Sequence, residues 1–201
     1  MPVQIGAGKF IPDETVINKI VGGFDVLGLS ANIGANFDAF EADVSHIDSV
    51  AFADPSTPVL NLTQTQVTND ASLLAKITSS YVLNASSAGA TTTTGHGNDL
   101  MITAVAGGND TITGGGSSEN FVFGANFGVD TIVDFSSHLA SPGADTITLP
   151  AAEFTNFTTM FTNDTTFSGG NAIIQSGGDQ LTIDGMTSTT LMAAQGDFKF
   201  V

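Results

Sequence analysis

Apolar residues in the first third of the chain occur in short runs that alternate with a segment of helical periodicity. The runs at 24–27 and 47–52 predict two strands. Between these runs, Ser30 is a suitable N-cap for a helix over about 31–42. The order strand, helix, strand indicates an α/β unit.

A second unit of the same kind follows. Strands are predicted over 59–62 and 81–83, with a helix over 64–77 between them. Thr63 and Gln66 have the spacing of a capping box, in which the hydroxyl and the amide side chain each satisfy a free backbone N–H group. The apolar residues of this helix recur at spacings of three and four and share one face: Val67, Ala71, Leu74 and Ile77.

The two units match when the sequence is shifted by 33 residues. Leu27 then falls on Leu60, and Ser30 falls on Thr63. Short repeats bury their apolar faces against neighbouring copies, so we expect stacked strand–helix–strand repeats. An ordinary α/β domain with similar elements remains the alternative.

The residue composition of the sequence changes after the second unit. Residues 84–94 contain no large apolar side chain, and glycine-rich turns with short β-type runs follow them. We therefore predict two domains, an α/β repeat module at 1–88 and a mostly β unit at 89–201.

Acidic residues dominate the charge and exclude several functions. The chain has 20 acidic residues, four lysines and no arginine, for a formal net charge of −16. Nucleic acids, phosphate groups and anionic membranes all require clustered cations, which this chain cannot supply. Cysteine is absent, and no apolar run approaches the length of a membrane-spanning helix.

The negative charge is unevenly distributed. Residues 77–198 contain eleven acidic residues and no cation, whereas residues 1–76 contain nine acidic residues and three lysines. A compact unit with eleven carboxylates repels itself unless something external neutralises it. A bound divalent metal ion is the obvious candidate.

Three consecutive segments repeat one pattern in which small residues precede an acid, and an apolar residue stands two positions after that acid. The acid and apolar residue are Asp99 and Met101, then Asp110 and Ile112, then Glu119 and Phe121. The pattern resembles the G-G-x-G-x-D-x-U-x nonapeptide of the repeats-in-toxin (RTX) proteins, a calcium-binding β-roll repeat.

Calcium chemistry explains these residue types. Calcium takes six to eight oxygen ligands from carboxylates and carbonyls, and glycine allows a turn to point its carbonyls at the ion. In a roll, the Asp99 turn is expected to face the Glu119 turn, and the Asp110 turn to face the Asp130 turn, both at a separation of 20 residues. The candidate calcium-binding residues are Gly95, Gly97, Asp99, Gly108, Asp110, Gly115, Glu119, Gly128, Asp130 and Asp134.

The resemblance continues beyond the repeats and covers about residues 95–201. The segment Phe127-Gly-Val-Asp-Thr-Ile-Val-Asp-Phe135 is similar to the F-G-x-D-x-I-x-D-F sequence that closes the roll in such proteins, where its two aspartates help to bind calcium. A hairpin at 171–183 and a short helix near 188–194 are expected next. Glu119 and Ser117 depart from the nonapeptide, so we expect one or two calcium ions.

The resemblance also implies a route out of the cell. RTX proteins usually carry an uncleaved C-terminal signal for type I secretion through an ABC transporter, and the chain start lacks the pattern of a secretory leader. Residues 24–84 resemble, more weakly, α/β units of large bacterial surface proteins. The expected fold is thus α+β and mostly β: stacked repeats, then a short parallel β-roll and a C-terminal β cap.

No common enzyme motif accompanies these features. The chain lacks the nucleophile-elbow, zinc-protease, Walker and Rossmann patterns, so we expect no catalytic activity. The sequence predicts a secreted, calcium-binding structural or adhesive protein, with a homo-oligomer or polymer such as a surface layer, filament or matrix as its expected assembly. The alternative is a secretion-and-folding module at the end of a larger effector or enzyme.

Overall fold

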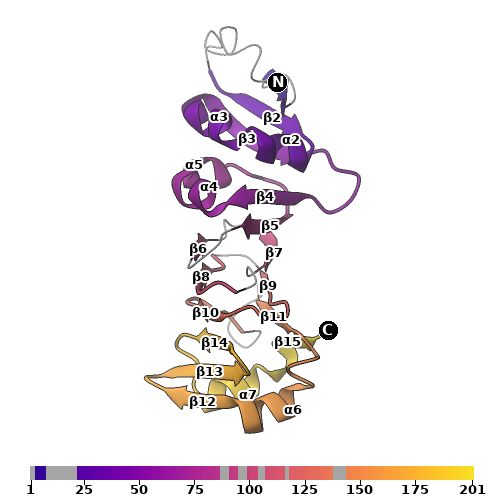
Figure 1. Cartoon of the computed structure of the whole chain (residues 1–201). Coiled ribbons are helices and arrows are strands. Elements are labelled where there is room, and N and C mark those ends of the chain that lie inside the picture. The colour runs from indigo at the N-terminus through magenta and orange to yellow at the C-terminus, as the bar shows by residue number, and fades with distance from the viewer. Residues whose placement is uncertain are drawn as a thin grey trace.

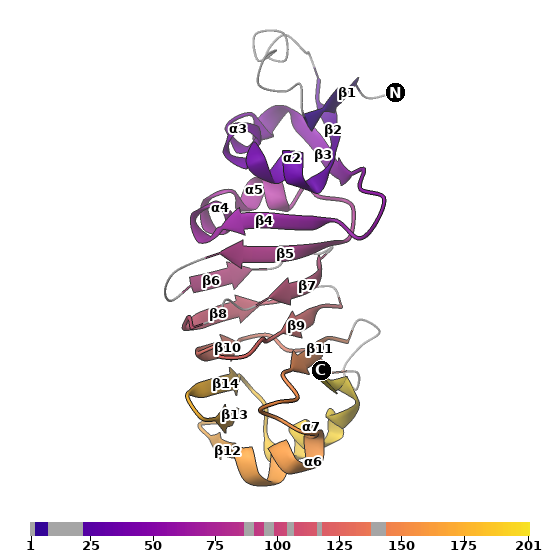
Figure 2. The same ribbon diagram turned by 45° about the vertical axis from the view of Figure 1, so that its right-hand side comes forward.

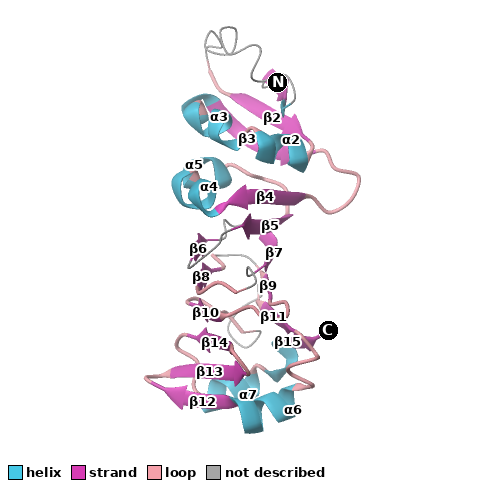
Figure 3. Ribbon diagram, viewed as in Figure 1, coloured by secondary structure: helices cyan, strands magenta, loops and turns pink. Residues whose placement is uncertain are grey.

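The structure is a computed structural model of the 201-residue chain. It describes residues 3–7, 22–86, 91–94, 99–103, 107–115, 118–137 and 144–201. The fold is mixed α/β, with many strands and short helices (Figure 3). The elements form an elongated stack, with the first strands at one end and the C-terminal hairpin at the other (Figure 1).

The first strand–helix–strand unit forms as predicted, with parallel strands. A three-stranded sheet, which we call the N-terminal sheet, has the order β1 (Val3–Gly6), β2 (Phe24–Gly28) and β3 (Ile47–Phe52). The helical part is divided into α2 (Ser30–Ala35), α3 (Phe37–Ala42) and the 3-10 turn η3 (Val44–His46). The interruption falls at Asn36, whose side-chain amide donates a 2.8 Å hydrogen bond to the Asn32 carbonyl. Such local bonds compete with the helical pattern.

The prediction that Ser30 caps the first helix is wrong by one residue. Leu29 occupies the cap position, and Ser30 is the first residue of α2. Asp54, from the loop after β3, accepts hydrogen bonds from the Ser30 amide at 2.8 Å and the Ser30 hydroxyl at 2.9 Å. A carboxylate that is distant in sequence therefore accepts the hydrogen bond of a free backbone N–H group at the helix N-terminus.

The second unit confirms the predicted capping box. Thr63 ends β4 (Val59–Thr63), and its hydroxyl accepts the Gln66 amide at 3.2 Å while Gln66 Oε1 accepts the Thr63 amide at 2.9 Å. The helix after it is again divided, into α4 (Gln64–Asn69) and α5 (Ala71–Leu74), with a non-helical Asp70 between them. The unit closes with β5 (Tyr81–Ser86), which pairs in parallel with β4.

One hydrophobic core joins the two units. The amide of Val50 in β3 donates to the Lys76 carbonyl, and the Thr78 amide donates to the Val50 carbonyl, both at 2.9 Å. The largest fully buried side chains of this core come from both units: Phe24, Ile33, Phe37, Phe40, Ile47, Leu60 and Tyr81.

From β5 to β12, successive strands alternate between two sheets (Figure 2). The long parallel sheet has the order β15-β11-β9-β7-β5-β4, and the mixed sheet has the order β12-β13-β14-β10-β8-β6. The strands of this middle part are β6 (Thr91–Thr94), β7 (Asp99–Thr103), β8 (Asp110–Thr113), β9 (Asn120–Val122), β10 (Val129–Ile132) and β11 (Thr146–Leu149).

The register of these strands agrees with the predicted spacing in one of two cases. In the mixed sheet Thr111 pairs with Thr131, which is the predicted offset of 20 residues. In the long parallel sheet Ile102 pairs with Phe121, an offset of 19 residues and one fewer than predicted. The second prediction is therefore wrong by one residue, since Ile102 stands three positions after Asp99 whereas its partner Phe121 stands two positions after Glu119.

The C-terminal part contains the predicted hairpin and helix, together with elements that the sequence did not indicate. The hairpin β13–β14 is antiparallel, and an additional strand, β12, pairs with β13. The elements are α6 (Phe157–Thr159), the π-helical turn η4 (Met160–Asp164), β12 (Thr165–Ser168), β13 (Asn171–Ser176), β14 (Asp179–Ile183), α7 (Ser188–Ala193), the 3-10 turn η5 (Gln195–Asp197) and β15 (Phe198–Phe200).

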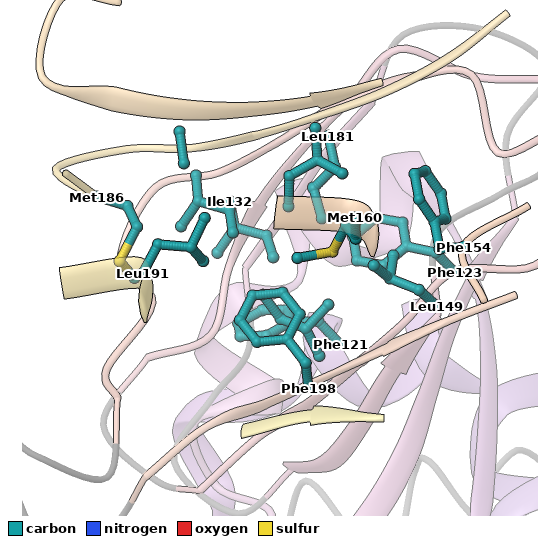
Figure 4. Close-up of a cluster of buried hydrophobic side chains, with 14 of the residues drawn as sticks. Phe121, Phe123, Ile132, Leu149, Phe154, Met160, Leu181, Met186, Leu191 and Phe198 are labelled. Atoms are coloured by element: carbon teal, nitrogen blue, oxygen red, sulfur yellow. The ribbon is translucent and has the colours of Figure 1, made fainter. Parts of the chain in front are cut away.

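A second core lies between the lower ends of the two sheets and the C-terminal helices. Phe135 packs between Phe121 and Phe198, with ring centroids 6.4 and 6.2 Å away, and Met160 of η4 and Leu191 of α7 belong to the same core (Figure 4). Burial of this apolar surface is the main favourable term that holds the C-terminal elements on the stack.

The long parallel sheet crosses the predicted domain boundary, because β5 pairs directly with β7. Residues 87–90 lie outside the described ranges, so the division at 88/89 stays a prediction. None of the helices in the described residues is long and apolar enough to span a membrane.

Candidate metal centre

The predicted calcium-binding residues lie at the turns that lead into the stacked strands. Gly95 and Gly97 fall outside the described residues. The backbone of Asp99 begins β7 and pairs with Tyr81. The others divide between two edges of the stack: the Asp130 edge, where the turns lead into β8, β10 and β14, and the Asp145 edge, where the turns lead into β9 and β11.

Glycine makes the close approach of turns at the Asp130 edge possible. Gly108 and Gly128 form a parallel bridge, and the Val129 amide donates to the Gly108 carbonyl at 3.1 Å. Gly128 has a φ of +98°, and a Cβ atom there would overlap the Gly108 carbonyl. Both the backbone conformation and the contact exclude other residues at position 128.

Asp130 is the central acid of this edge. Its side chain is fully buried, and its Oδ1 accepts the Asp110 amide at 2.8 Å. Its Oδ2 is also buried and meets no hydrogen-bond donor among the described residues. Burial, together with the charges of Asp110 and Asp179, raises the pKa of Asp130 to about 7, although the hydrogen bond from Asp110 opposes this shift.

Two further acids at the Asp130 edge were missed by the sequence reasoning. Asp179 begins β14, and its Oδ1 accepts the Gly128 amide at 2.9 Å. Glu153 follows β11, and burial together with a hydrogen bond to Asp179 raises the pKa of Glu153. A signal for Asp179 was present, since glycines precede it and Leu181 stands two positions after it, as in the three repeats. Glu153 has no such signal.

The Asp145 edge uses its carboxylates to fix turns. Asp134 accepts the amides of Gly114 at 2.7 Å and Gly115 at 2.9 Å. Asp145, which was not among the predicted residues, accepts the amides of Glu119 at 3.0 Å and Ser136 at 2.8 Å.

Glu119 and Asp145 are both buried, so this edge too contains carboxylates that are shielded from solvent. Burial raises the pKa of Asp145, opposed by the hydrogen bonds from Ser136 and Glu119 and reinforced by the charge of Asp134.

The donor set at both edges suits a hard cation. It consists of carboxylate and carbonyl oxygens, and the chain has no cysteine to add a thiolate, so this is the chemistry that calcium prefers. Asp130 fits such a role because its Oδ2 is buried and unsatisfied. Within the described ranges, no three His, Asp or Glu side chains are placed to hold an ion together. Main-chain carbonyls would have to supply most of the ligands.

No protein-family model matches this chain, and no curated protein matches it either.

Proposed function

We propose that the chain is a secreted, calcium-stabilised and non-catalytic structural or adhesive protein. In this proposal the first units are stacked α/β repeats, and the strands that alternate between two sheets form an RTX-like β-roll with a C-terminal cap. The observation that carries it is Asp130, a fully buried carboxylate with an unsatisfied oxygen beside glycine turns. Residues 77–198 contain no lysine or arginine to neutralise it.

Calcium would then control when the second half folds. In a calcium-poor cytosol the eleven carboxylates of residues 77–198 repel one another and oppose compaction, which suits export through a type I ABC transporter. At extracellular calcium concentrations, ions bind the folded turns and not the unfolded chain. Binding free energy becomes folding free energy.

Assembly of several copies follows from the two ends of the stack. Among the described strands, those at the ends of each sheet order have a neighbour on one side only, and of these β1 and β12 lie at the two ends of the stack (Figure 1). Unpaired strand edges invite pairing with another chain. Electron microscopy with and without calcium tests this part, and monodisperse particles under both conditions would leave only the role of a secretion-and-folding module.

The test of the calcium requirement is a thermal unfolding experiment on the full chain. We expect the circular dichroism spectrum to gain β-structure, and the melting temperature to rise, when calcium replaces a chelator. Magnesium at the same concentration should do much less, because its small octahedral shell fits carbonyl-rich turns poorly. An unchanged spectrum and melting temperature in calcium would contradict the proposed function.

A further inference from the structure

A hollow of about 460 Å³ opens at the Asp130 edge, where the stack meets the C-terminal elements. Three segments far apart in sequence line it: the stacked turns with Gly107, Asn126 and Gly128, the loop with Glu153, and the β13–β14 turn at 176–179. Figure 2 shows β14 directly below β10, so the hairpin turn continues the column of turns.

The hollow is rich in main-chain oxygen. Half of its lining residues are glycines, which present only backbone atoms, and Gly107, Gly128 and Gly177 all have positive φ. Asn126 also has a positive φ of 57°, the sole such non-glycine in the described ranges. Turns of this kind bring carbonyl groups and amides to one side, which is how calcium loops gather neutral ligands.

Two carboxylates meet at this hollow without a cation between them. Asp179 is 8% exposed and lies within hydrogen-bond reach of Glu153, so the two acids hold each other at close range. One oxygen of Glu153, Oε2, is buried without a hydrogen-bond donor in the described part of the chain. No residue that lines the hollow is a lysine. Two carboxylates that touch in this way repel each other when both are ionised.

A third negative group, Asp130, interacts with Asp179. It is two residues beyond Gly128 and is fully buried. Its unsatisfied Oδ2 is an independent sign of missing positive charge, because a buried carboxylate without a partner is costly. A cation in the hollow would compensate both the pair and this neighbour.

We propose that this hollow is a calcium site in which Glu153 and Asp179 are the charged ligands and the glycine turns supply carbonyl oxygens. The site rests on the proposed function and shares the Gly107 and Gly128 turns with it, but its two charged ligands lie outside the three nonapeptide-like segments. It needs only two acidic side chains. By joining the roll turns, the loop after β11 and the β13–β14 hairpin, the ion would fasten the C-terminal elements to the stack.

The variants Glu153→Gln and Asp179→Asn test the site in the full chain. Both keep an oxygen that accepts the existing backbone hydrogen bonds and remove one negative charge. Asp164→Asn, in η4 and outside the hollow, is the matched control for the loss of one charge. Calcium binding is measured by isothermal titration and by native mass spectrometry, with calcium alone as the probe.

We expect each hollow variant to lose one bound calcium ion per chain relative to the wild type, with a higher melting temperature in chelator and a smaller gain in calcium. The control should keep the wild-type number of ions. If both hollow variants bind as many ions as the wild type, this site is overturned while the proposed function stands. If the wild type itself binds no calcium, the proposed function fails and the site fails with it.

Discussion

At the scale of single residues, three aspartates, Asp43, Asp70 and Asp130, each carry a buried oxygen that lacks a donor among the described residues, and the pKa is raised for two of them. Asp130 lies in the stack, and Asp70 lies between α4 and α5 with an exposed fraction of 7%. Burial, a hydrogen bond to Asp38 and the charges of Asp38 and Glu41 raise the pKa of Asp70 to about 6. Both carboxylates therefore oppose folding when they are ionised.

The first prediction concerns Asp70 and pH. Its pKa is about 6 in the folded protein and near 3.8 in the unfolded chain, so the folded state holds the proton more tightly. The stabilisation that comes from this tighter proton binding is fully present below about pH 4 and is lost as pH rises through 6. Asp70→Asn should raise the melting temperature at pH 7.5 and flatten its pH dependence between 4 and 6.

The matched control for this variant is Asp48→Asn, an exposed acid on β3 of the first unit. It removes the same charge without relieving a buried group. Differential scanning calorimetry across pH 4–8 in the presence of chelator measures both variants. Equal shifts for the two variants would mean that overall charge, and not burial of Asp70, controls the effect.

The second prediction concerns Asp130 in chelator and in calcium. Asp130→Asn keeps an oxygen that can accept the Asp110 amide and removes the buried charge. At pH 8 in chelator we expect a higher melting temperature than for the wild type, because an ionised and unsatisfied group is gone. In calcium the wild type should have the higher melting temperature, because the bound ion lacks the negative charge of Asp130 in the variant. A variant that is more stable than the wild type in both solutions would contradict the role of Asp130 in calcium binding.

At the scale of elements, local signals were sufficient where neighbouring residues decide the structure. The Thr63–Gln66 capping box, the strands on either side of it and the β13–β14 hairpin form as the sequence indicates. The divided helices were not predictable from apolar periodicity, because their breaks depend on polar residues at Asn36 and Asp70. The cap at Ser30 was misplaced because Asp54, 24 residues away, supplies the acceptor.

The candidate site was predictable to a similar extent. Asp110 and Asp130 are brought together because the strands that follow them pair at the expected offset. Asp145 and Glu153 escaped prediction because no repeat pattern surrounds them, and only the fold carries them to the turns. Spacing therefore identifies the residues of the turns, while tertiary structure adds acids from the loops.

The third prediction belongs to the α4 terminus. Thr63→Ala removes the hydroxyl that accepts the Gln66 amide, and N-cap replacements of this kind cost about 1 kcal/mol. For a chain of this length that corresponds to a fall in melting temperature of about 2–4 °C. Thr65→Ala, on the exposed side of the same helix, should be neutral or slightly stabilising because alanine favours helix. Equal losses in the two variants would exclude a capping role.

At the scale of the whole molecule, the long parallel sheet connects parts that differ greatly in charge. It runs from β4 and β5, in the unit with lysines, to β15 near the C-terminus. The N-terminal sheet, β1–β2–β3, is separate from it. Any event that orders the middle strands is therefore passed directly to β5 through strand pairing, and reaches β2 only indirectly, through side-chain packing and the Val50 main-chain bonds that join β3 to the second unit.

The fourth prediction follows from this connection and is read by hydrogen–deuterium exchange. If calcium orders the middle of the stack, β5 has a bonded neighbour in calcium and becomes an edge strand in chelator. Its amides should then exchange more slowly in calcium, whereas those of β2, which has partners on both sides within its own sheet, should change little. The β2 amides serve as the internal control in the same sample. Equal protection of β5 with and without calcium would show that the β5–β7 pairing forms without the ion, and that calcium acts only further along the stack.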